Sequence, residues 1–306
     1  MGIYEQMKKN FIMADAYEDW SAYRNTLTDY LIGLADGEEI PLNVTRHMYE
    51  EISLPTLAII GAGRLNDLDL QRLLPYFSHI TLMDMDSEVM EASVPEIESA
   101  KVDTQIFSLT GIYDEDYKVF AEKLQRYLQE EGGRMTPESF CKYAMDCVKE
   151  QYRNKSIPEY RTYDYVWCFG VHSQLQGMYG YIYQTFLSYL CQEQFEEEEE
   201  VKLPFLNLLK EYNRQLIPAA NDTLLRMARK TCIIGNEWDV IEHPEELYRM
   251  KEVPDCAIEG AYGAITDIRK RDIAVLEKLL LWPFDVKRAI YYEMLIQQID
   301  RTKEVA

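Results

Sequence analysis

Short apolar runs alternate with helical patterns over most of the chain after Pro55. Unbroken apolar runs are typical of strands buried on both faces, and apolar positions three and four apart indicate amphipathic helices. The alternation predicts an α/β fold with a parallel sheet covered on both sides. Strands are predicted at 57–61, 79–83, 104–109, 163–169 and 231–236, and helices at 67–76, 87–100 and 180–191.

Two segments add to this alternation. Residues 16–34 carry an apolar stripe at helical spacing, so residues 1–54 are predicted to form an N-terminal helical cap before a main domain at 55–306. A helical insertion is predicted at about 113–160, where Thr136 and Pro137 have the pattern of an N-cap followed by proline.

The aromatic and aliphatic residues near the C-terminus, at 286–299, predict an edge strand that runs into a short helix. A helix throughout fits the periodicity of this segment nearly as well. The acidic run at 196–200 is expected to be a solvated helix end or loop, and the alternative is a surface that attracts a basic partner.

The charge balance is strongly acidic, with 53 Asp and Glu against 32 Lys and Arg and a net charge of −21. Nucleic acids and anionic membranes are bound mainly through Lys and Arg, so neither is an expected partner. The first residues lack the pattern of a secretory signal, and no apolar run is long enough to span a bilayer. We therefore expect a cytoplasmic protein.

The cysteines are scattered and form no C-x-x-C pair. In a chain of this size they are expected to be buried small side chains rather than metal ligands. No metal site is predicted. The six positions are Cys141, Cys147, Cys168, Cys191, Cys232 and Cys256.

An apolar strand followed by Gly-x-Gly is the first candidate for chemistry. The missing side chains of Gly61 and Gly63, which flank Ala62, allow a ligand to approach the backbone. Asp84 ends the next predicted strand about twenty residues later, the distance at which a carboxylate accepts hydrogen bonds from ribose hydroxyls. Asp86 is the second candidate for that role. The pattern predicts a nucleoside-containing cofactor lying across the turn.

The residues after the glycines separate two classes of cofactor. A dinucleotide fingerprint needs a small residue where Asn66 stands, and the carboxylate of Asp67 would repel a pyrophosphate. S-adenosylmethionine has no phosphate and carries a sulfonium and an ammonium cation, so the turn can accommodate or use Asp67. We therefore predict S-adenosylmethionine with its ammonium group near Asp67. An NAD-dependent oxidoreductase and a tight turn without a ligand are the alternatives.

The run G-A-G-x-x-x-D-L, with the acidic end of the second strand, resembles the class I S-adenosylmethionine-dependent methyltransferases. The resemblance implies a Rossmann-like, mostly parallel seven-stranded sheet flanked by helices. It also implies that the glycine turn lies under the methionine part, that Asp84 holds the ribose and that Met85 packs on adenine. Where this family usually has an Asp that reaches the adenine amino group, the chain offers hydroxyl or backbone groups, from Ser108, Leu109 and Thr110.

The predicted fourth strand and the loop after it are a second point of resemblance. In the family this loop faces both cofactor and acceptor, which implies that Phe169, Gly170 and Val171 lie near the methyl group. His172 and Gln174 are the polar residues best placed to orient or deprotonate an acceptor. A histidine that caps the next helix is an equally good interpretation of His172.

The N-terminal pattern Trp20-x-x-Tyr23-Arg24 further resembles that of a bacterial group of proteins with this fold. In related methyltransferases an N-terminal helix closes over the cofactor, which implies that Tyr23 and Arg24 can meet the methionine carboxylate. Alternatively, Trp20 and Tyr23 belong to the core.

Tyrosines gathered between 160 and 183 suggest either an aromatic site for a cationic acceptor or the packing of the insertion against the sheet. The function predicted from all these features is transfer of a methyl group to a small-molecule acceptor. A methyltransferase-like binding or interaction protein without activity is the alternative.

Overall fold

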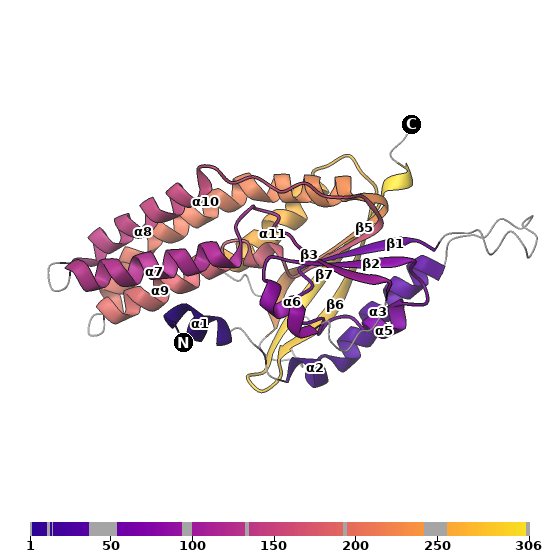
Figure 1. The fold of residues 1–306 in the computed structure, drawn as a ribbon, viewed down its shortest axis with the longest axis horizontal. Helices are drawn as coiled ribbons and strands as arrows, with labels where there is room; N and C mark the ends of the chain where they lie inside the picture. The colour runs from indigo at the N-terminus through magenta and orange to yellow at the C-terminus, as the bar shows by residue number, and fades with distance from the viewer. Residues whose placement is uncertain are drawn as a thin grey trace, which may run out of the picture.

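The computed structural model describes residues 2–10, 13, 15–36, 54–93, 100–131, 135–191, 195–241 and 256–303. Its centre is a seven-stranded sheet in the order β3-β2-β1-β4-β5-β7-β6 (Figure 1). The pairs among β1 to β5 are parallel, and β7 is antiparallel to both its neighbours. This confirms the predicted α/β, Rossmann-like fold. The strands are β1 (Thr56–Ile60), β2 (His79–Asp84), β3 (Val102–Ile106), β4 (Tyr163–Phe169), β5 (Ala228–Ile241), β6 (Val275–Asp285) and β7 (Ile290–Asp300).

Helices cover both faces of this sheet and extend beyond one side of it (Figure 1). Two short 3-10 helices, η2 (His172–Gln174) and η4 (Arg301–Lys303), add to them. The α-helices are α1 (Ile3–Lys9), α2 (Ala16–Asp19), α3 (Ser21–Asp36), α5 (Leu70–Leu73), α6 (Ser87–Ser93), α7 (Asp114–Glu131), α8 (Pro137–Tyr152), α9 (Gly177–Leu190), α10 (Phe195–Met227) and α11 (Cys256–Arg269).

Several predicted boundaries shift in the structure. The predicted strand 163–169 coincides with β4, whereas β3 starts and ends before the predicted 104–109. Its pairing with β2 begins opposite Ile80 and ends opposite Asp84, where β2 itself ends. The predicted helix 67–76 shortens to the single turn α5, since the residues before it form an extended loop. The second half of the predicted helix 87–100 lies outside the described residues.

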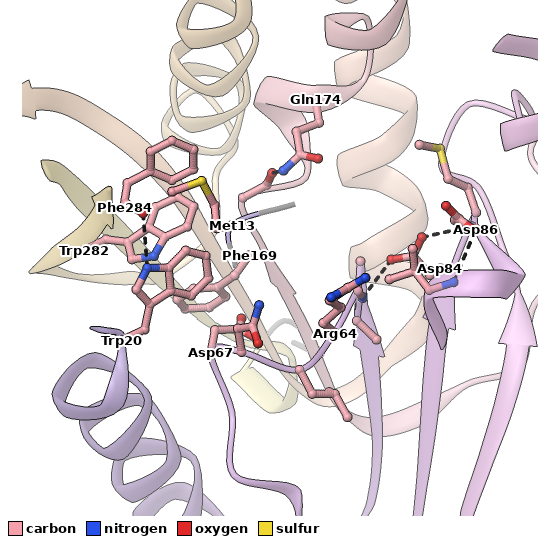
Figure 2. Close-up of a pocket in the computed structure, with 18 of the residues that line it drawn as sticks. Met13, Trp20, Arg64, Asp67, Asp84, Asp86, Phe169, Gln174, Trp282 and Phe284 are labelled. Carbon is pink, nitrogen blue, oxygen red and sulfur yellow. Dashed lines mark hydrogen bonds between the residues drawn. The ribbon is translucent and has the colours of Figure 1, made fainter. Parts of the chain in front are cut away.

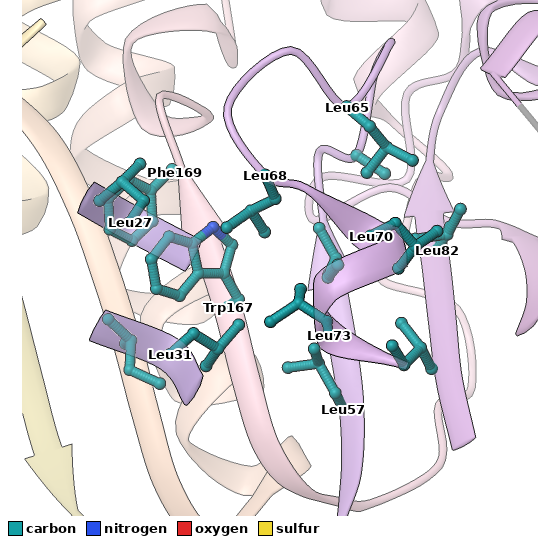
Figure 3. Close-up of a cluster of buried hydrophobic side chains, with 14 of the residues drawn as sticks. Leu27, Leu31, Leu57, Leu65, Leu68, Leu70, Leu73, Leu82, Trp167 and Phe169 are labelled. Carbon is teal, nitrogen blue, oxygen red and sulfur yellow. The ribbon is translucent and has the colours of Figure 1, made fainter. Parts of the chain in front are cut away.

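Strand β4 shows how the sheet is built into two cores. Its side chains alternate, so that Tyr165, Trp167 and Phe169 pack on one face while Val166 and Cys168 pack on the other. The first face is covered by α3, α5 and the loop before α5 (Figure 3). The second face is covered by the C-terminal half of α10 and by α11. A strand with two buried faces explains why its sequence is an almost unbroken apolar run.

The predicted helical insertion consists of α7 and α8, which pack with α9 and the first half of α10 around a separate apolar cluster (Figure 1). Thr136 caps α8 in a capping box with Ser139, and Pro137 occupies the first turn, as the sequence predicts. Helix α10 has 33 residues and would extend about 50 Å if straight. The acidic run at 196–200 lies in its first turns, which agrees with the helix-end interpretation.

The N-terminal helices divide between these clusters. Tyr4 and Met7 of α1 pack against the insertion, whereas Tyr23, Leu27 and Leu31 of α3 pack on the sheet. The predicted helix at 16–34 is interrupted at Trp20, where α2 ends and α3 follows. The N-terminal segment therefore contacts both the insertion and the sheet.

The C-terminal prediction is partly wrong. The segment does form a strand, β7, but it lies inside the sheet, and the edge is β6. The two strands form a hairpin whose turn includes Ala289 with φ of 53°. Hydrophobic patterning identifies a strand without giving its neighbours, so the order was not accessible from the pattern. The short helix expected after it is η4.

One further expectation concerns the cysteines. The cysteines whose side chains are described are all free and buried, as expected: Cys141, Cys147, Cys168, Cys191 and Cys232. Within the described residues, no group of three or more His, Cys, Asp and Glu side chains is arranged so that it could bind a metal ion. Nor does any helix in the described part of the chain combine the length and apolarity needed to cross a membrane.

The packing of β4 on β5 gives a first prediction. A Cβ atom at Gly235 would lie 2.4 Å from the Phe169 ring, so Gly235→Ala should lower the free energy of unfolding by about 1–3 kcal/mol. Gly33→Ala is the matched control, because nothing lies within 4 Å of its Cβ position in the exposed part of α3. Gly33→Ala should instead raise the free energy of unfolding by about 0.5–1 kcal/mol. Urea unfolding measures both, and equal effects would contradict the packing described.

Candidate functional site

Two adjoining cavities lie at the carboxyl ends of β1, β2 and β4. The strand order reverses between β1 and β4, which is where α/β sheets bind ligands. The larger cavity has a volume of about 330 Å³ and the smaller about 200 Å³. They share Gly61, Gly63, Asp84, Met85 and Phe169. Residues from the first, second and fourth strands thus meet around one continuous site.

The turn after β1 is fixed to the end of β2 by its backbone. The amides of Gly61 and Ala62 both donate to the carbonyl oxygen of Met83, at 2.8 and 3.0 Å. Gly61 has φ of +71°, and a Cβ there would lie 2.3 Å from Cγ2 of Val171, so no other residue fits. Gly63 has φ of +48°, and a Cβ there would make only an ordinary contact, 3.8 Å from the carbonyl oxygen of Gly61. The turn therefore offers an open surface on a rigid backbone.

Asp84 joins the turn to β2. Its Oδ2 accepts a hydrogen bond from the Gly63 amide at 2.9 Å, and its Oδ1 accepts one from the Asp86 amide at 3.0 Å. Burial raises the pKa of Asp84, and these backbone donors oppose the rise. A carboxylate can accept about four hydrogen bonds, so Asp84 retains capacity for the hydroxyls of a ligand. Met85 lines both cavities beside it.

Asp86, the second candidate for ribose, has other partners. It accepts a hydrogen bond from the Glu88 amide at 3.0 Å at the start of α6, and it forms an ion pair with Lys8 of α1 at 2.6 Å. Lys8 also pairs with Asp114 at 3.0 Å, and the Tyr4 hydroxyl donates to the same carboxylate. This cluster fastens α1 over the edge of the larger cavity, which Lys8 lines.

The segment after β3 lines the smaller cavity with Ser108, Leu109 and Thr110. The hydroxyls of Ser108 and Thr110 lie 3.2 Å apart, and they accept from the amides of Thr110 and Ile112. These bonds shape the turn and hold the hydroxyls at the cavity. The sequence prediction that they face the ligand where an Asp is missing is compatible with this placement.

Three charged side chains surround the start of the loop before α5. Asp67 and Arg64 both line the larger cavity, and Figure 2 shows both on the cavity side of the loop. Arg24, which the sequence placed at the methionine carboxylate, does not line either cavity. Its Nη1 instead donates to the carbonyl oxygens of Tyr17 and Asn66, at 2.7 and 3.1 Å. Arg24 has a structural role, because it joins the N-terminal helices to the loop before α5. A buried guanidinium with these partners has little freedom to reach a ligand.

The electrostatics of Asp67 are unusual for an aspartate. Burial raises its pKa to about 6, and its own backbone amide, the Arg24 guanidinium and the Trp167 indole N–H oppose that rise. Arg64 is exposed and makes no hydrogen bond or ion pair with another described residue. Sequence reasoning missed Arg64, since only the course of the loop, in which Leu65 has φ of 56°, turns it toward the cavity.

The loop after β4 lines the cavities except at His172. Phe169 and Gln174 line both cavities, Gly170 lines the larger and Val171 the smaller. His172 is fully buried and lines neither. Its ring lies near Asn221 of α10 and Asn236 of β5, and burial lowers its pKa to about 4. The prediction that His172 faces the acceptor is therefore wrong in position, because η2 turns the side chain into the core.

One wall of the larger cavity is aromatic. Trp20 and Tyr23 come from the N-terminal helices, and Trp282 and Phe284 come from β6 (Figure 2). These four residues are termed the aromatic wall. Trp20 Nε1 donates to the Phe284 carbonyl oxygen at 3.3 Å, which joins the two segments. Sequence reasoning included Trp20 and Tyr23 only as an N-terminal pattern and missed Trp282 and Phe284, because β6 was not predicted.

The tyrosines between 160 and 183 do not form this wall. Tyr179 and Tyr183 of α9 pack against the helical insertion, and Tyr165 packs under α3. None of the tyrosines in this group lines either cavity. The alternative in which they serve as packing residues is the one the structure supports.

Comparisons with known proteins give remote matches only. No family model matches the chain, and no curated protein matches it. Among solved structures it is similar to the O-methyltransferase TomG from Streptomyces achromogenes, crystallised with S-adenosylmethionine, at 8% identity and a TM-score of 0.37 over 94% of this chain and 99% of that one.

Two further solved structures are similar to the chain at the same level. The plantazolicin methyltransferase BpumL, in complex with S-adenosylhomocysteine, matches at 11% identity and a TM-score of 0.35 over 97% of this chain and 89% of that one. The methyltransferase domain of the bacterial protein CtHen1-C matches at 13% identity and a TM-score of 0.36, over 83% and 92% of the two chains. Likenesses this remote carry no conclusion about substrate or activity.

The raised pKa of Asp67 predicts a stability cost. The pKa is about 6 in the folded protein against an ordinary aspartate value of 3.8, so the folded state holds the proton more tightly than the unfolded state. The wild type should therefore lose stability as the pH rises from about 4 to about 6. Above that range Asp67→Asn should unfold with a free energy higher by on the order of 1–2 kcal/mol, reduced because the side chain is partly exposed.

Urea unfolding at pH 8 and pH 5 tests this expectation. The gain from Asp67→Asn should be larger at pH 8. Asp272→Asn, at an exposed carboxylate outside both cavities, is the control and should change little at either pH. An equal effect of Asp67→Asn at both pH values would contradict the assigned burial.

Proposed function

We propose that the chain binds S-adenosylmethionine across the two cavities and transfers its methyl group to a small-molecule acceptor held against the aromatic wall. The observation that carries the proposal is the charge pattern of one loop. Arg64 and Asp67, three residues apart, present opposite charges to the same cavity next to the open glycine turn. The amino-acid end of S-adenosylmethionine is a zwitterion, whose carboxylate and ammonium groups match this pair.

The remaining residues fit the nucleoside. Asp84 has unused acceptor capacity for ribose hydroxyls, and Gly63 has no side chain to keep a ligand from the backbone of the turn. Met85 and Leu109 give apolar contact for a flat base, with the Ser108 and Thr110 hydroxyls at the edge of the smaller cavity. Around the turn the carboxylates of Asp67 and Asp84 flank the cation Arg64, and two carboxylates do not suit a doubly negative pyrophosphate. This favours S-adenosylmethionine over a dinucleotide.

When bound, S-adenosylmethionine supplies an electrophilic methyl group on a sulfonium centre. The chain's own contribution is to orient the reactants and exclude water. Gln174 Nε2 donates to the Gly170 carbonyl oxygen at 2.8 Å, which fixes the side chain where the two cavities meet. Phe169 stacks on Trp167 with ring centroids 3.9 Å apart, so the floor beside the turn is apolar and rigid. With His172 buried, no general base is assigned.

The first test is calorimetric titration with S-adenosylmethionine, S-adenosylhomocysteine and NADH. Asp84→Asn should weaken binding of the first two at least about tenfold, because charge-assisted bonds to the ribose become neutral ones. Asp272→Asn should not change the affinity. Binding of NADH but not of S-adenosylmethionine would overturn the proposal in favour of an oxidoreductase. Binding without methyl transfer to any acceptor tested would instead favour the interaction protein.

A second test isolates the zwitterion pair. Arg64→Met should weaken S-adenosylmethionine about five- to tenfold by removing the partner of its carboxylate. Decarboxylated S-adenosylmethionine lacks that group, so its affinity should change by less than about twofold. Arg24→Met would show the same selectivity only if Arg24 were the carboxylate partner. Equal weakening of both ligands by Arg64→Met would contradict the assignment.

A further inference from the structure

We infer that the aromatic wall selects an amine acceptor, one that carries positive charge as substrate or product. This inference rests on the proposed function and adds the chemical class of the acceptor. It depends on the arrangement of the rings, on two carboxylates beside them and on the absence of cations from the wall.

The rings of the aromatic wall pack in direct contact with one another, and all of them line the larger cavity. Trp20 and Phe284 are nearly parallel, at 28° with centroids 6.5 Å apart. Trp282 stands across them, at 77° and 4.9 Å from Trp20 and at 79° and 5.1 Å from Phe284. Figure 2 shows this group on the opposite side of the cavity from Asp84 and Asp86. Aromatic rings attract cations, so the part of this cluster that lines the cavity offers a surface for an ammonium group.

Two carboxylates lie close to the aromatic wall. Asp67 lines the same cavity, and Glu237 of β5 lies behind Gly170, with its Oε1 3.7 Å from the Cβ position of that glycine. Burial raises the pKa of Tyr23, and the charges of Asp67 and Glu237 raise it further, so both carboxylates lie near this ring. A cation beside Tyr23 would be attracted by both.

Glu237 also has an unused oxygen. Its side chain is 95% buried, and Oε1 accepts from the Ser173 hydroxyl at 2.8 Å. Oε2 has no hydrogen-bond partner among the described residues, nor does Nε1 of Trp282, which is also buried. A buried carboxylate oxygen without a partner is costly unless a ligand or water satisfies it. Glu237 does not line the cavity, so its charge acts on an ammonium group at the aromatic wall from behind Gly170.

The cavity offers little to an anionic acceptor. The basic residues that line it are Lys8 and Arg64. Lys8 is committed to Asp86 and Asp114, and Arg64 belongs to the glycine turn rather than to the aromatic wall. A carboxylate or phosphate acceptor would therefore meet aromatic faces and acidic groups without a counter-charge.

An amine also suits the charge balance of the proposed reaction. The lone pair of a neutral amine nitrogen forms the new bond to the methyl carbon while the carbon–sulfur bond breaks and its electron pair goes to sulfur. The positive charge thereby passes from sulfur to nitrogen, and any N–H proton of the product leaves to water. A site that stabilises cations favours this charge throughout the transfer.

The test compares two ligands of nearly the same shape. Choline and 3,3-dimethylbutan-1-ol share the hydroxyl and the branched end but differ in charge. Protein saturated with S-adenosylhomocysteine is titrated with each by calorimetry. Choline should bind at least about tenfold more tightly than the neutral alcohol. Trp282→Leu should reduce this preference at least about fivefold, with the affinity for S-adenosylhomocysteine changing less than about twofold.

Trp238→Leu is the matched control, because Trp238 follows Glu237 on the other face of β5, where it stacks on Tyr262 at 5.3 Å. It should leave the preference unchanged. Glu237→Gln should reduce the preference and supports the assignment if Trp282→Leu fails to fold. Equal binding of the two ligands, or binding of neither to the loaded protein, would overturn the amine assignment alone. Failure of S-adenosylhomocysteine to bind would instead overturn the proposed function on which it rests.

Discussion

The attachment of the first turn to the second strand is the constraint on which the site depends. Two successive amides, of Gly61 and Ala62, share the carbonyl oxygen of Met83, and Asp84 completes the link through Gly63. Because Gly61 passes directly beneath Val171, the loop after β4 is held to the same point. Three strands are thereby aligned at one edge of the sheet by contacts that only a glycine backbone permits. The cavities lie at this edge, where the strand order reverses between β1 and β4.

The sequence was most informative where a single local requirement, such as burial of both faces of a strand, decides which residues can occupy a segment. Strand β4 was located to the residue because burial of both faces requires an unbroken apolar run. Asp84 was identified because a carboxylate at the end of a second strand has a fixed relation to the turn after the first. In both cases the local pattern alone carries the information, and distant residues do not alter it.

Other features depended on the tertiary arrangement. His172 and Arg24 have the polarity expected of site residues, yet the short helix η2 turns one into the core and the carbonyl of Asn66 holds the other in place. Trp282 and Arg64 reach the cavity only through the hairpin of β6 and the left-handed backbone of Leu65. Strand neighbours and loop direction are set by contacts far apart in sequence, so no periodicity reveals them.

Helix α10 has a mechanical consequence for the whole molecule. Its first half packs in the helical insertion and its second half on the sheet, so the border between the two lies within one continuous helix. A helix resists bending except where its hydrogen-bond ladder is broken, and Pro204 and Pro218 are such places. Pro218 lies where α10 reaches the sheet. Within α10, a bend between the insertion and the sheet is therefore easiest at this proline, because elsewhere it would break further backbone hydrogen bonds.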